Sequence, residues 1–594
     1  MKLVVPFVGE LHAVDARLIR LAEFLGIRCE TLPLAKDVVQ QAEYLERAVP
    51  DKRSCFVVNP RVMEEWVGGN VLASDLVSFL LSRFPHLFVH GIRLDAFDAN
   101  IVAAMSRGRL QSIHAVDGVS TQYQIAKHSN DVCGAFSGLS FGPTNPANDH
   151  VFSGNGSDPA VRTLISIGDH PIMAVMKQWG TEVLFLGSED TAELNAEAGD
   201  APVIEHFSRL VPHTIALRHV FAEECWHPCH AYASLIIDDP LLRRNYGFLN
   251  FESLLRLMRQ HNFHTTIAFI PHNFGRSSPA ITKMFRENTA RFALCFHGND
   301  HTGAEFASAD TALLNTMLQI AERRMNAHQE ITGLHCDKVM VFPQGKFSSE
   351  AMEVLKRRNF SAAVNTVPHP SGHPVRLTIG ELAQPAVLRY RGFPLFLRTS
   401  IRQIQSHDIA FNLLYGKPVL IVAHHDIFQR PESLAEIASR INIVSPGIHW
   451  SNLASVVGNS ILRRRAPDGT YCVRAYSSTV QVSNDSGSVE RFSIEWCCSG
   501  QCAPVEQVLK DGTPCNNFEV DDARIRVTLD LAPGTLQTFS VVHRNVDATL
   551  SSLGFRYNTN AFLRRRLSEV RDNYLSKNQR VLSVAKILQR SLLH

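Results

Sequence analysis

Four short polar motifs, each directly after an apolar run, have the residue types needed to bind a metal ion and to carry out hydrolysis. They are Asp238-Asp239 after SLII, His297-Gly-Asn-Asp-His301 after LCF, Pro343-Gln-Gly345 after VMVF, and His424-His425-Asp426 after LIVA. If the apolar runs are parallel barrel strands, their carboxyl ends meet at one face, where side chains from several strands converge. One such motif alone would be weak evidence, whereas four in succession predict a single site.

Two histidines and one carboxylate are a typical ligand set of catalytic zinc, with an open coordination position. His297 and His301 are four residues apart, so on a helical turn they face the same way. A second carboxylate beside the ligands could accept a proton from the attacking water, and a further histidine could protonate the leaving group. Each motif also has a simpler interpretation. An Asp pair after a strand often marks a turn or a helix start, and a His-x-x-x-His pair is often two packed histidines.

The four motifs, in this order, resemble those of the polysaccharide deacetylase (NodB-homology) superfamily, from Tyr232 to about Leu462. The resemblance implies a distorted (β/α) barrel that removes N- or O-acetyl groups from glycans with a divalent metal, for which Zn²⁺ is the expected ion. It implies that Asp238 is the base and that the metal ligands are Asp239, His297 and His301. It places the acid at His424 or His425, and the sequence His-Asp-Ile-Phe favours His425.

The sequence departs from the family pattern at several positions. Pro240 replaces the glycine after the Asp pair, and Val341 stands where the family has the arginine that holds the base. The orientation of Asp238 must then come from elsewhere, with Arg389, Arg391 and Arg398 as candidates. The family's Asp-x-x-Asp-Trp segment is not evident. The expected substrate-binding residues are His424, Asn273, Pro343, Gly345 and Arg398; Asn273 could equally be a packing or capping residue.

The elements that must position these motifs form a repeated strand–helix pattern over residues 206–465, typical of a (β/α) barrel. The predicted strands are Ser234–Ile237, Thr266–Ile270, Phe292–Phe296, Val339–Phe342, Ala362–Val364 and Val419–Ala423, with a short strand near Ile448–Trp450. An apolar face at Phe251, Leu254, Leu255 and Met258 predicts one of the helices between them.

The rest of the chain predicts three further regions in an overall α/β fold. Residues 1–205 alternate strands and helices, which favours a parallel sheet of unknown role, with Ser129–Pro159 as a lid or disordered loop. Residues 466–545 contain short strands separated by Gly-containing turns and predict a β-sandwich. Residues 546–594 form a basic helical tail, for which docking on its own protein is favoured over binding to a membrane surface.

Composition narrows the class of protein. The chain has 594 residues and a formal net charge of +2, so it has no global basic field for nucleic acid. Its apolar runs are far shorter than the roughly 20 residues that a transmembrane helix needs, and the N-terminus does not resemble a secretory signal, which predicts a cytoplasmic protein. Among the 12 cysteines, buried thiols are favoured over metal binding at Cys225/Cys229/His230 and at Cys497, Cys498, Cys502 and Cys515.

We therefore expect a metal-dependent hydrolase that deacetylates an amino sugar or glycan. The expected partner is a carbohydrate substrate, and assembly into a homo-oligomer stays open. One alternative is a non-catalytic glycan-binding or interaction protein with a degenerate barrel, which the missing arginine at Val341 favours and the retained ligands oppose. A second alternative is a metal-dependent amidase for a non-sugar substrate, because the same ligands serve any acyl transfer.

Overall fold

The computed structural model describes most of the chain. The described residues are 1–35, 41–49, 53–70, 74–116, 122–142, 148–154, 158–199, 203–372, 375–497, 504–521, 524–544 and 553–574. Cys498 and Cys502, and residues 575–594 of the predicted tail, lie outside them. In this part of the chain, no helix combines the length and hydropathy that crossing a bilayer requires.

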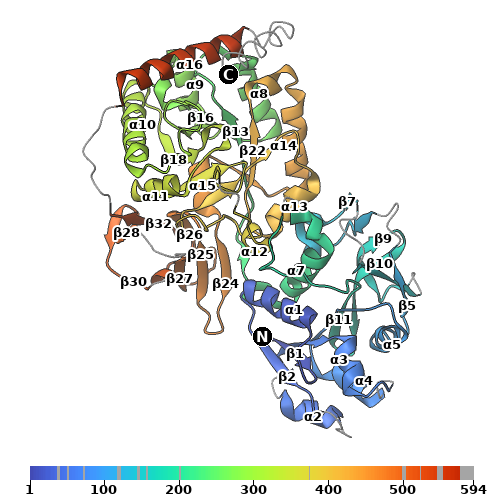
Figure 1. Ribbon diagram of the computed structural model, residues 1–594. Coiled ribbons are helices and arrows are strands. Elements are labelled where there is room, and N and C mark those ends of the chain that lie inside the picture. The colour runs from blue at the N-terminus through green and yellow to red at the C-terminus, as the bar shows by residue number, and fades with distance from the viewer. Residues whose placement is uncertain are drawn as a thin grey trace.

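The predicted barrel is confirmed as the centre of the molecule (Figure 1). Its sheet has the strand order β20-β19-β18-β17-β16-β13-β22-β21, and every ladder in it is parallel. The strands are β13 (Tyr232–Asp238), β16 (Thr265–Phe269), β17 (Phe292–His297), β18 (Cys336–Val341), β19 (Ala362–Asn365), β20 (Leu395–Leu397), β21 (Thr399–Ser400) and β22 (Val419–Ala423); β23 (His449–Trp450) pairs with β13.

A single extended segment closes the barrel. The edge strands β20 and β21 are separated only by Arg398. β20 pairs with β19, and β21 pairs with β22 on the other side. The backbone N–H of Arg398 donates to the carbonyl of Asn365, and that of Ile401 donates to the carbonyl of Val422. This closure, which the sequence did not predict, fixes Arg398 in the barrel wall.

Helices pack around the barrel. They are α8 (Phe251–His261), α9 (Pro279–Glu287), α10 (Thr311–Thr332), α11 (Ser349–Arg357), α12 (Ile379–Leu382), α13 (Ser406–Leu414), α14 (Glu432–Val444) and α15 (Leu453–Asn459). In α8 the side chain of Asn250 accepts the N–H of Ser253 as an N-cap, and Asn262 ends the helix in the left-handed conformation. All four predicted apolar residues of α8 are buried.

The N-terminal region is a nine-stranded mixed sheet, so the expected parallel sheet is only half right. Its order is β2-β1-β3-β4-β11-β10-β9-β6-β7; the ladders from β2 to β11 are parallel and those from β11 to β7 antiparallel. The reason is that β9, β10 and β11 follow one another through short turns, which reverse the chain. The strands are β1 (Lys2–Phe7), β2 (Cys29–Pro33), β3 (Ser54–Val58), β4 (His86–Val89), β6 (Tyr123–Ile125), β7 (Ser140–Phe141), β9 (Arg162–Ile167), β10 (His170–Gln178) and β11 (Thr181–Leu186).

Short elements and helices complete this region. The helices are α1 (Ala13–Phe24), α2 (Gln41–Ala48), α3 (Pro60–Trp66), α4 (Ser74–Arg83), α5 (Ala96–Met105), α6 (Asn130–Cys133) and α7 (Phe207–Phe221). β5 (Leu110–Ala115) pairs with β8 (His150–Gly154). Of the two predictions for Ser129–Pro159, the disordered loop is wrong for the described part, which contains α6, β7 and β8, and the lid stays a prediction. The Tyr123 hydroxyl donates to the buried Asp149, and this bond ties the segment to the sheet.

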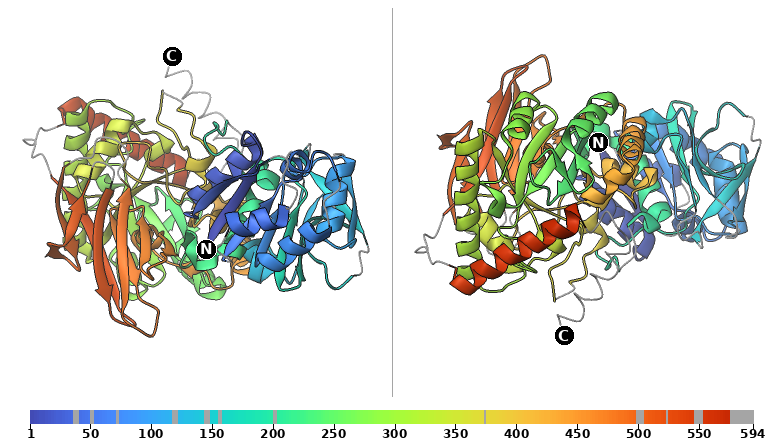
Figure 2. Two further views of the ribbon diagram at one scale, coloured as in Figure 1. Left: turned by 90° about the horizontal axis from the view of Figure 1, so that it is seen from below. Right: turned by 90° about the horizontal axis from the view of Figure 1, so that it is seen from above.

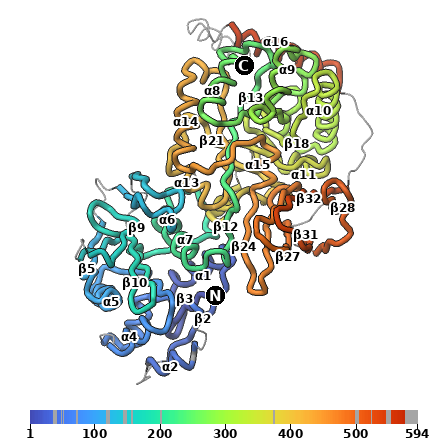
Figure 3. The backbone as a smooth tube through the Cα atoms, turned by 180° about the vertical axis from the view of Figure 1, so that it is seen from behind, coloured from blue at the N-terminus to red at the C-terminus, as the bar shows by residue number. Residues whose placement is uncertain are grey.

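Two sheets with mostly antiparallel ladders contain the strands of residues 466–545, where a β-sandwich is predicted. One has the order β12-β24-β25-β27-β31-β30 and the other β26-β32-β28-β29. The strands are β12 (His227–Pro228), β24 (Leu462–Arg465), β25 (Tyr471–Ala475), β26 (Thr479–Ser483), β27 (Glu490–Cys497), β28 (Val505–Lys510), β29 (Thr513–Cys515), β30 (Phe518–Val520), β31 (Arg524–Leu531) and β32 (Leu536–His543). Figure 3 shows these sheets and the N-terminal region as separate bodies beside the barrel.

A last helix, α16 (Phe555–Asn573), lies on the barrel rather than apart from it (Figures 1 and 2). Its contacts are with the loops that follow β13, β16 and β17: Tyr246 donates to Asp572 at 2.8 Å, Thr302 is 3.0 Å from the Tyr557 hydroxyl, and Arg276 is paired with Glu569. α16 therefore lies across the end of the barrel where the polar motifs are.

Candidate metal centre

Asp239, His297 and His301 come together at the carboxyl ends of β13 and β17. One donor atom from each lies within 4.8 Å of the others. The Asp239 Oδ1 atom is 3.4 Å from His297 Nε2 and 3.2 Å from His301 Nε2. Two of these residues have left-handed backbones, with φ of 80° at Asp239 and 56° at His301. Such strained conformations of non-glycine residues are typical of functional sites.

The donor set fits a tetrahedral divalent ion. Metal–ligand distances of about 2.0–2.1 Å at tetrahedral angles place two donors roughly 3.3 Å apart, which is close to the separations observed. The Asp239 Oδ1 atom is buried and has no hydrogen-bond partner among the described residues. A buried carboxylate oxygen without a donor is costly, and a cation between it and the two imidazoles would satisfy it.

Both histidines can present Nε2 to a metal ion. His297 Nδ1 is 3.0 Å from the carbonyl oxygen of Val341 and is the donor, so Nε2, which faces Asp239, is the atom that a metal ion would bind after its proton is lost. Burial is the main cause that lowers the pKa of His301, to about 4, so its ring is neutral at pH 7. Burial also lowers the pKa of His297, but Asp238 and Asp239 outweigh it and the net shift is upward. Metal binding should therefore release a proton from His297.

Glu305 holds the loop that carries both histidines, and sequence reasoning missed it. Its Oε1 atom accepts the N–H groups of Asn299 and His301 at 2.8 and 3.3 Å, and its Oε2 atom accepts that of Asp300 at 3.2 Å. The loop must pass close to this carboxylate, because a Cβ atom on Gly298 would lie 2.0 Å from Glu305 Oε1. Its place four residues after His301 was the only available signal.

Asp238, the predicted base, is separate from the ligand set and is held by Arg398. The guanidinium donates to both carboxylate oxygens, and both residues are buried. Burial would raise the pKa of Asp238, but Arg398 and then His297 outweigh it and the net shift is downward. Arg398, predicted both as a substrate-binding residue and as a candidate to orient Asp238, has the second role here. Arg389 is paired instead with Glu381.

The two candidate acids point in different directions, as expected for neighbours at a strand end. His424 is exposed, and its charge lowers the pKa of Asp238. His425 Nε2 is 3.5 Å from Asp572 of α16, and its ring packs against Tyr246 and Phe248. A Cβ atom on Gly247 would lie 2.3 Å from His425 Nδ1, so the absence of a side chain there makes room for the ring. The choice of His425 as the acid stays a prediction.

The other predicted site residues lie around this centre in supporting positions. Asn273 is buried, and its side-chain oxygen accepts from Arg276 at 3.3 Å. Pro343 packs against the histidine loop at Gly298. The carbonyl of Gly345 accepts the Asn365 side chain at 2.9 Å. No contact that the structure describes assigns any of the three to a substrate.

The chain is similar to known proteins in structure rather than in sequence. No protein-family model and no curated protein sequence matches the chain. Among solved structures it is similar to Agd3, described as a novel carbohydrate deacetylase, with 9% identity over 91% of this chain and 98% of that chain and a TM-score of 0.48. It is also similar to a family 4 carbohydrate esterase from Streptomyces lividans, with 14% identity, 38% and 95% coverage and a TM-score of 0.23.

The residues that the structure describes contain no second group of potential metal ligands. Among the described residues, the ligand set above is the only group of His, Cys, Asp and Glu side chains with metal-binding spacing. Cys225 is buried and Cys229 half-buried, as free thiols.

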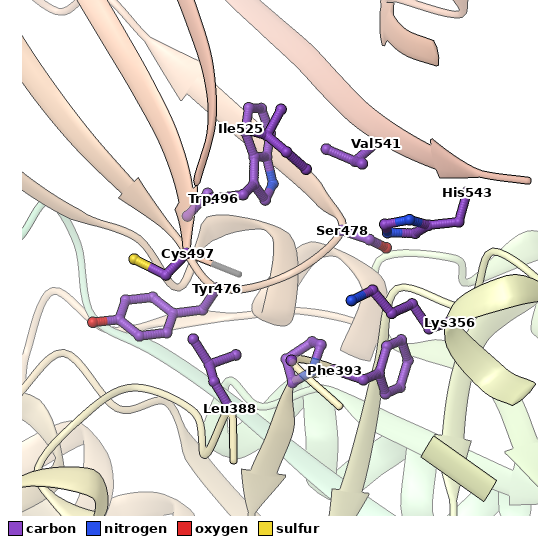
Figure 4. A pocket seen from close by; sticks show the side chains of 13 residues that line it. Lys356, Leu388, Phe393, Tyr476, Ser478, Trp496, Cys497, Ile525, Val541 and His543 are labelled. Carbon is purple, nitrogen blue, oxygen red and sulfur yellow. The ribbon is translucent and has the colours of Figure 1, made fainter. Parts of the chain in front are cut away.

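A pocket between the barrel and the sandwich is lined by Lys356, Tyr476 and Trp496, among others (Figure 4). The Lys356 ammonium there donates to the carbonyl of Arg391.

Proposed function

We propose that this protein is a metal-dependent hydrolase that removes an acyl group, most simply acetyl, from an amino sugar or a related glycan. The observation that carries the proposal is the pairing of a three-ligand centre with a separate buried carboxylate. Asp239, His297 and His301 form the centre, and Asp238 beside them is fixed by Arg398. The likeness of the four motifs to the polysaccharide deacetylases supports membership of that superfamily.

The chain's own residues supply the proton transfers. A divalent ion held by the three ligands would lower the pKa of a water molecule and polarise the acyl oxygen. Asp238 is ionised at neutral pH, because its pKa is below the usual value, and it accepts the proton of the attacking water. Arg398 uses one direction of each carboxylate oxygen, which leaves the others for that proton. His425 then protonates the leaving amine or alcohol, with His424 as the alternative donor.

The rival function, glycan binding without turnover, has less support because Arg398 binds the carboxylate of the predicted base, Asp238. Val341 lacks the arginine of the family motif, but its carbonyl oxygen binds His297 and the missing guanidinium comes from Arg398. An inactive barrel has no need for a buried, ionised carboxylate next to a metal centre, because such a group is costly to bury.

Acetate release by the metal-loaded protein tests the proposal. The panel contains N-acetylated amino-sugar oligomers, O-acetylated glycans and simple acetamides without a sugar. Release from a glycan that stops on chelation and returns with Zn²⁺ is expected. Release from acetamides alone would favour the non-sugar amidase, and glycan binding without release from any member would favour the non-catalytic protein.

A further inference from the structure

We propose that Arg565, on the buried face of α16, binds a negatively charged group of the ligand, so that the preferred substrate is an anionic glycan with its charge close to the acyl group. That the anionic ligand is a substrate rests on the function proposed above. The anion site itself rests only on the burial and surroundings of Arg565.

Arg565 is a buried cation with no hydrogen bond or ion pair among the described residues. Its exposed fraction is 3%, and its Nε and Nη2 atoms are buried without a hydrogen-bond partner in this part of the chain. The acidic residues on the same face are engaged by other groups. Glu569 is paired with Arg276, and Asp572 binds Tyr246 and lies beside His425 and Arg571. Arg565 acts on Glu569 and Asp239 through its charge, but neither carboxylate forms an ion pair with it.

The guanidinium faces the end of the barrel that holds the metal centre, because Glu569 and Asp572 on the same face of α16 contact the loops there. In line with this position, its charge lowers the pKa of Asp239 and the pKa of His301. Asp239 cannot serve as its lasting partner, because the same carboxylate is the predicted metal ligand. Once a cation takes up the charge of Asp239, Arg565 is a second positive group in a buried site. An unpaired buried charge is strongly unfavourable, so a site of this kind is suited to an anion that enters with the ligand.

α16 holds Arg565 in place from both sides. Tyr557 contacts Thr302 before it, and Glu569 and Asp572 contact Arg276 and Tyr246 after it. Ala561, one turn earlier on the same face, is also buried. A carboxylate or a phosphate would match the planar guanidinium with two parallel hydrogen bonds. A carboxylated sugar, such as a uronic acid, and a phosphorylated sugar share this chemistry.

Direct binding separates this inference from the proposed activity. Glucuronate, glucose and inorganic phosphate are titrated calorimetrically into the zinc-loaded full chain. We expect glucuronate or phosphate, but not glucose, to bind, and Arg565→Gln to weaken that binding at least tenfold. The matched control is Arg566→Gln, which removes the neighbouring arginine, 52% exposed at its side chain, and should bind as the wild type does. Equal anion binding by Arg565→Gln and the wild type, or no anion binding by either, would overturn the proposal.

Two further readouts distinguish binding from a structural role. Arg565→Gln should unfold at the same or a higher temperature than the wild type, because it removes a buried charge; a marked fall would indicate a structural arginine. If the protein deacetylates glycans, substrates with a uronate next to the acetylated sugar should be preferred over neutral ones through a lower KM. Arg565→Gln should abolish that preference, measured as the ratio of kcat/KM for anionic and neutral substrates in the same variant, and Arg565→Lys should keep part of it. No deacetylation by the wild type, with anion binding intact, would refute the proposed function and not the anion site.

Discussion

The Arg398 guanidinium donates to both oxygens of Asp238, at 2.7 and 2.6 Å, across 160 residues of sequence. Asp238 ends β13, and Arg398 is the single residue between β20 and β21. The closure of the barrel therefore places Arg398 beside Asp238, the predicted base. This pair replaces the arginine that the sequence lacks at Val341, so the departure from the family motif costs the site no positive charge.

Removing that partner should move the pH dependence of the reaction. The active form of Asp238 is the carboxylate, which is present above its pKa, and the pKa is below its usual value of 3.8. In Arg398→Met, burial is no longer opposed by the guanidinium and raises the pKa. The acidic limb of the profile of kcat/KM against pH should therefore move to higher pH. Arg398→Lys keeps the charge without the paired geometry and should move the limb less.

The control for this experiment is Arg389→Met, which breaks the pair with Glu381 at the surface. It should leave the acidic limb in place. Identical profiles for Arg398→Met, Arg398→Lys and the wild type would mean that Asp238 is not the titrating base.

Asp238→Asn should keep the metal and the fold but lose turnover, and it should unfold at a lower temperature because Arg398 is left buried without a carboxylate. The amide has nearly the same shape but cannot accept the water's proton, and loss of a general base costs on the order of 10²–10⁴-fold in rate. Initial rates, with the metal content and thermal unfolding measured on the same samples, check this. A variant with wild-type rates would eliminate the proposed role of Asp238.

Glu305→Gln should weaken metal binding although it replaces none of the three predicted ligands. The carboxylate accepts three backbone N–H groups of the histidine loop, and the amide group of glutamine would turn a donor toward some of them. Changes to groups that orient ligands typically cost about 10–100-fold in metal affinity. Competition with a zinc chelator measures the loss. Glu353→Gln, which only breaks a surface pair with Arg357, should match the wild type, and a Glu305→Gln affinity as high as that control would show that the loop needs no such support.

Single alanine substitutions decide between the candidate acids. We expect His425→Ala to lose turnover and keep its metal, and His424→Ala to retain most of its activity. One observation supports each residue as the acid. His425 lies beside the carboxylate of Asp572, and the charge of His424 lowers the pKa of Asp238. Turnover that is lost only in His424→Ala would reverse the choice. Activity in both variants would remove a histidine acid from the mechanism.

The sequence predicted those parts of the molecule that depend on local pattern. Apolar runs followed by polar residues located β13, β17 and β22 to within a few residues, and their parallel pairing brought the predicted ligands together. β20 and β21 were missed because they are three and two residues long and are interrupted by a charged residue. Neither has enough residues to show a strand periodicity.

Contacts between distant segments were beyond the reach of periodicity. Nothing in the sequence of the helical tail indicates that the charge of Arg565 acts on Asp239 or that Asp572 lies beside His425, because this depends on where α16 docks. Likewise, the candidates for orienting Asp238 could be limited to Arg389, Arg391 and Arg398, but only the closed barrel distinguishes them. The features that the sequence could not predict are mainly the contacts made by residues that lie between the predicted strands and helices.

The metal content of the purified protein tests the central claim most directly. Elemental analysis is made on the wild type, on His297→Ala and on His261→Ala, a histidine of α8 outside the site. We predict about one equivalent of a divalent metal in the wild type and in His261→Ala, and a severe loss in His297→Ala, because a three-ligand site rarely survives the loss of one ligand. Full metal occupancy in His297→Ala would contradict the assignment of Asp239, His297 and His301 as the metal ligands.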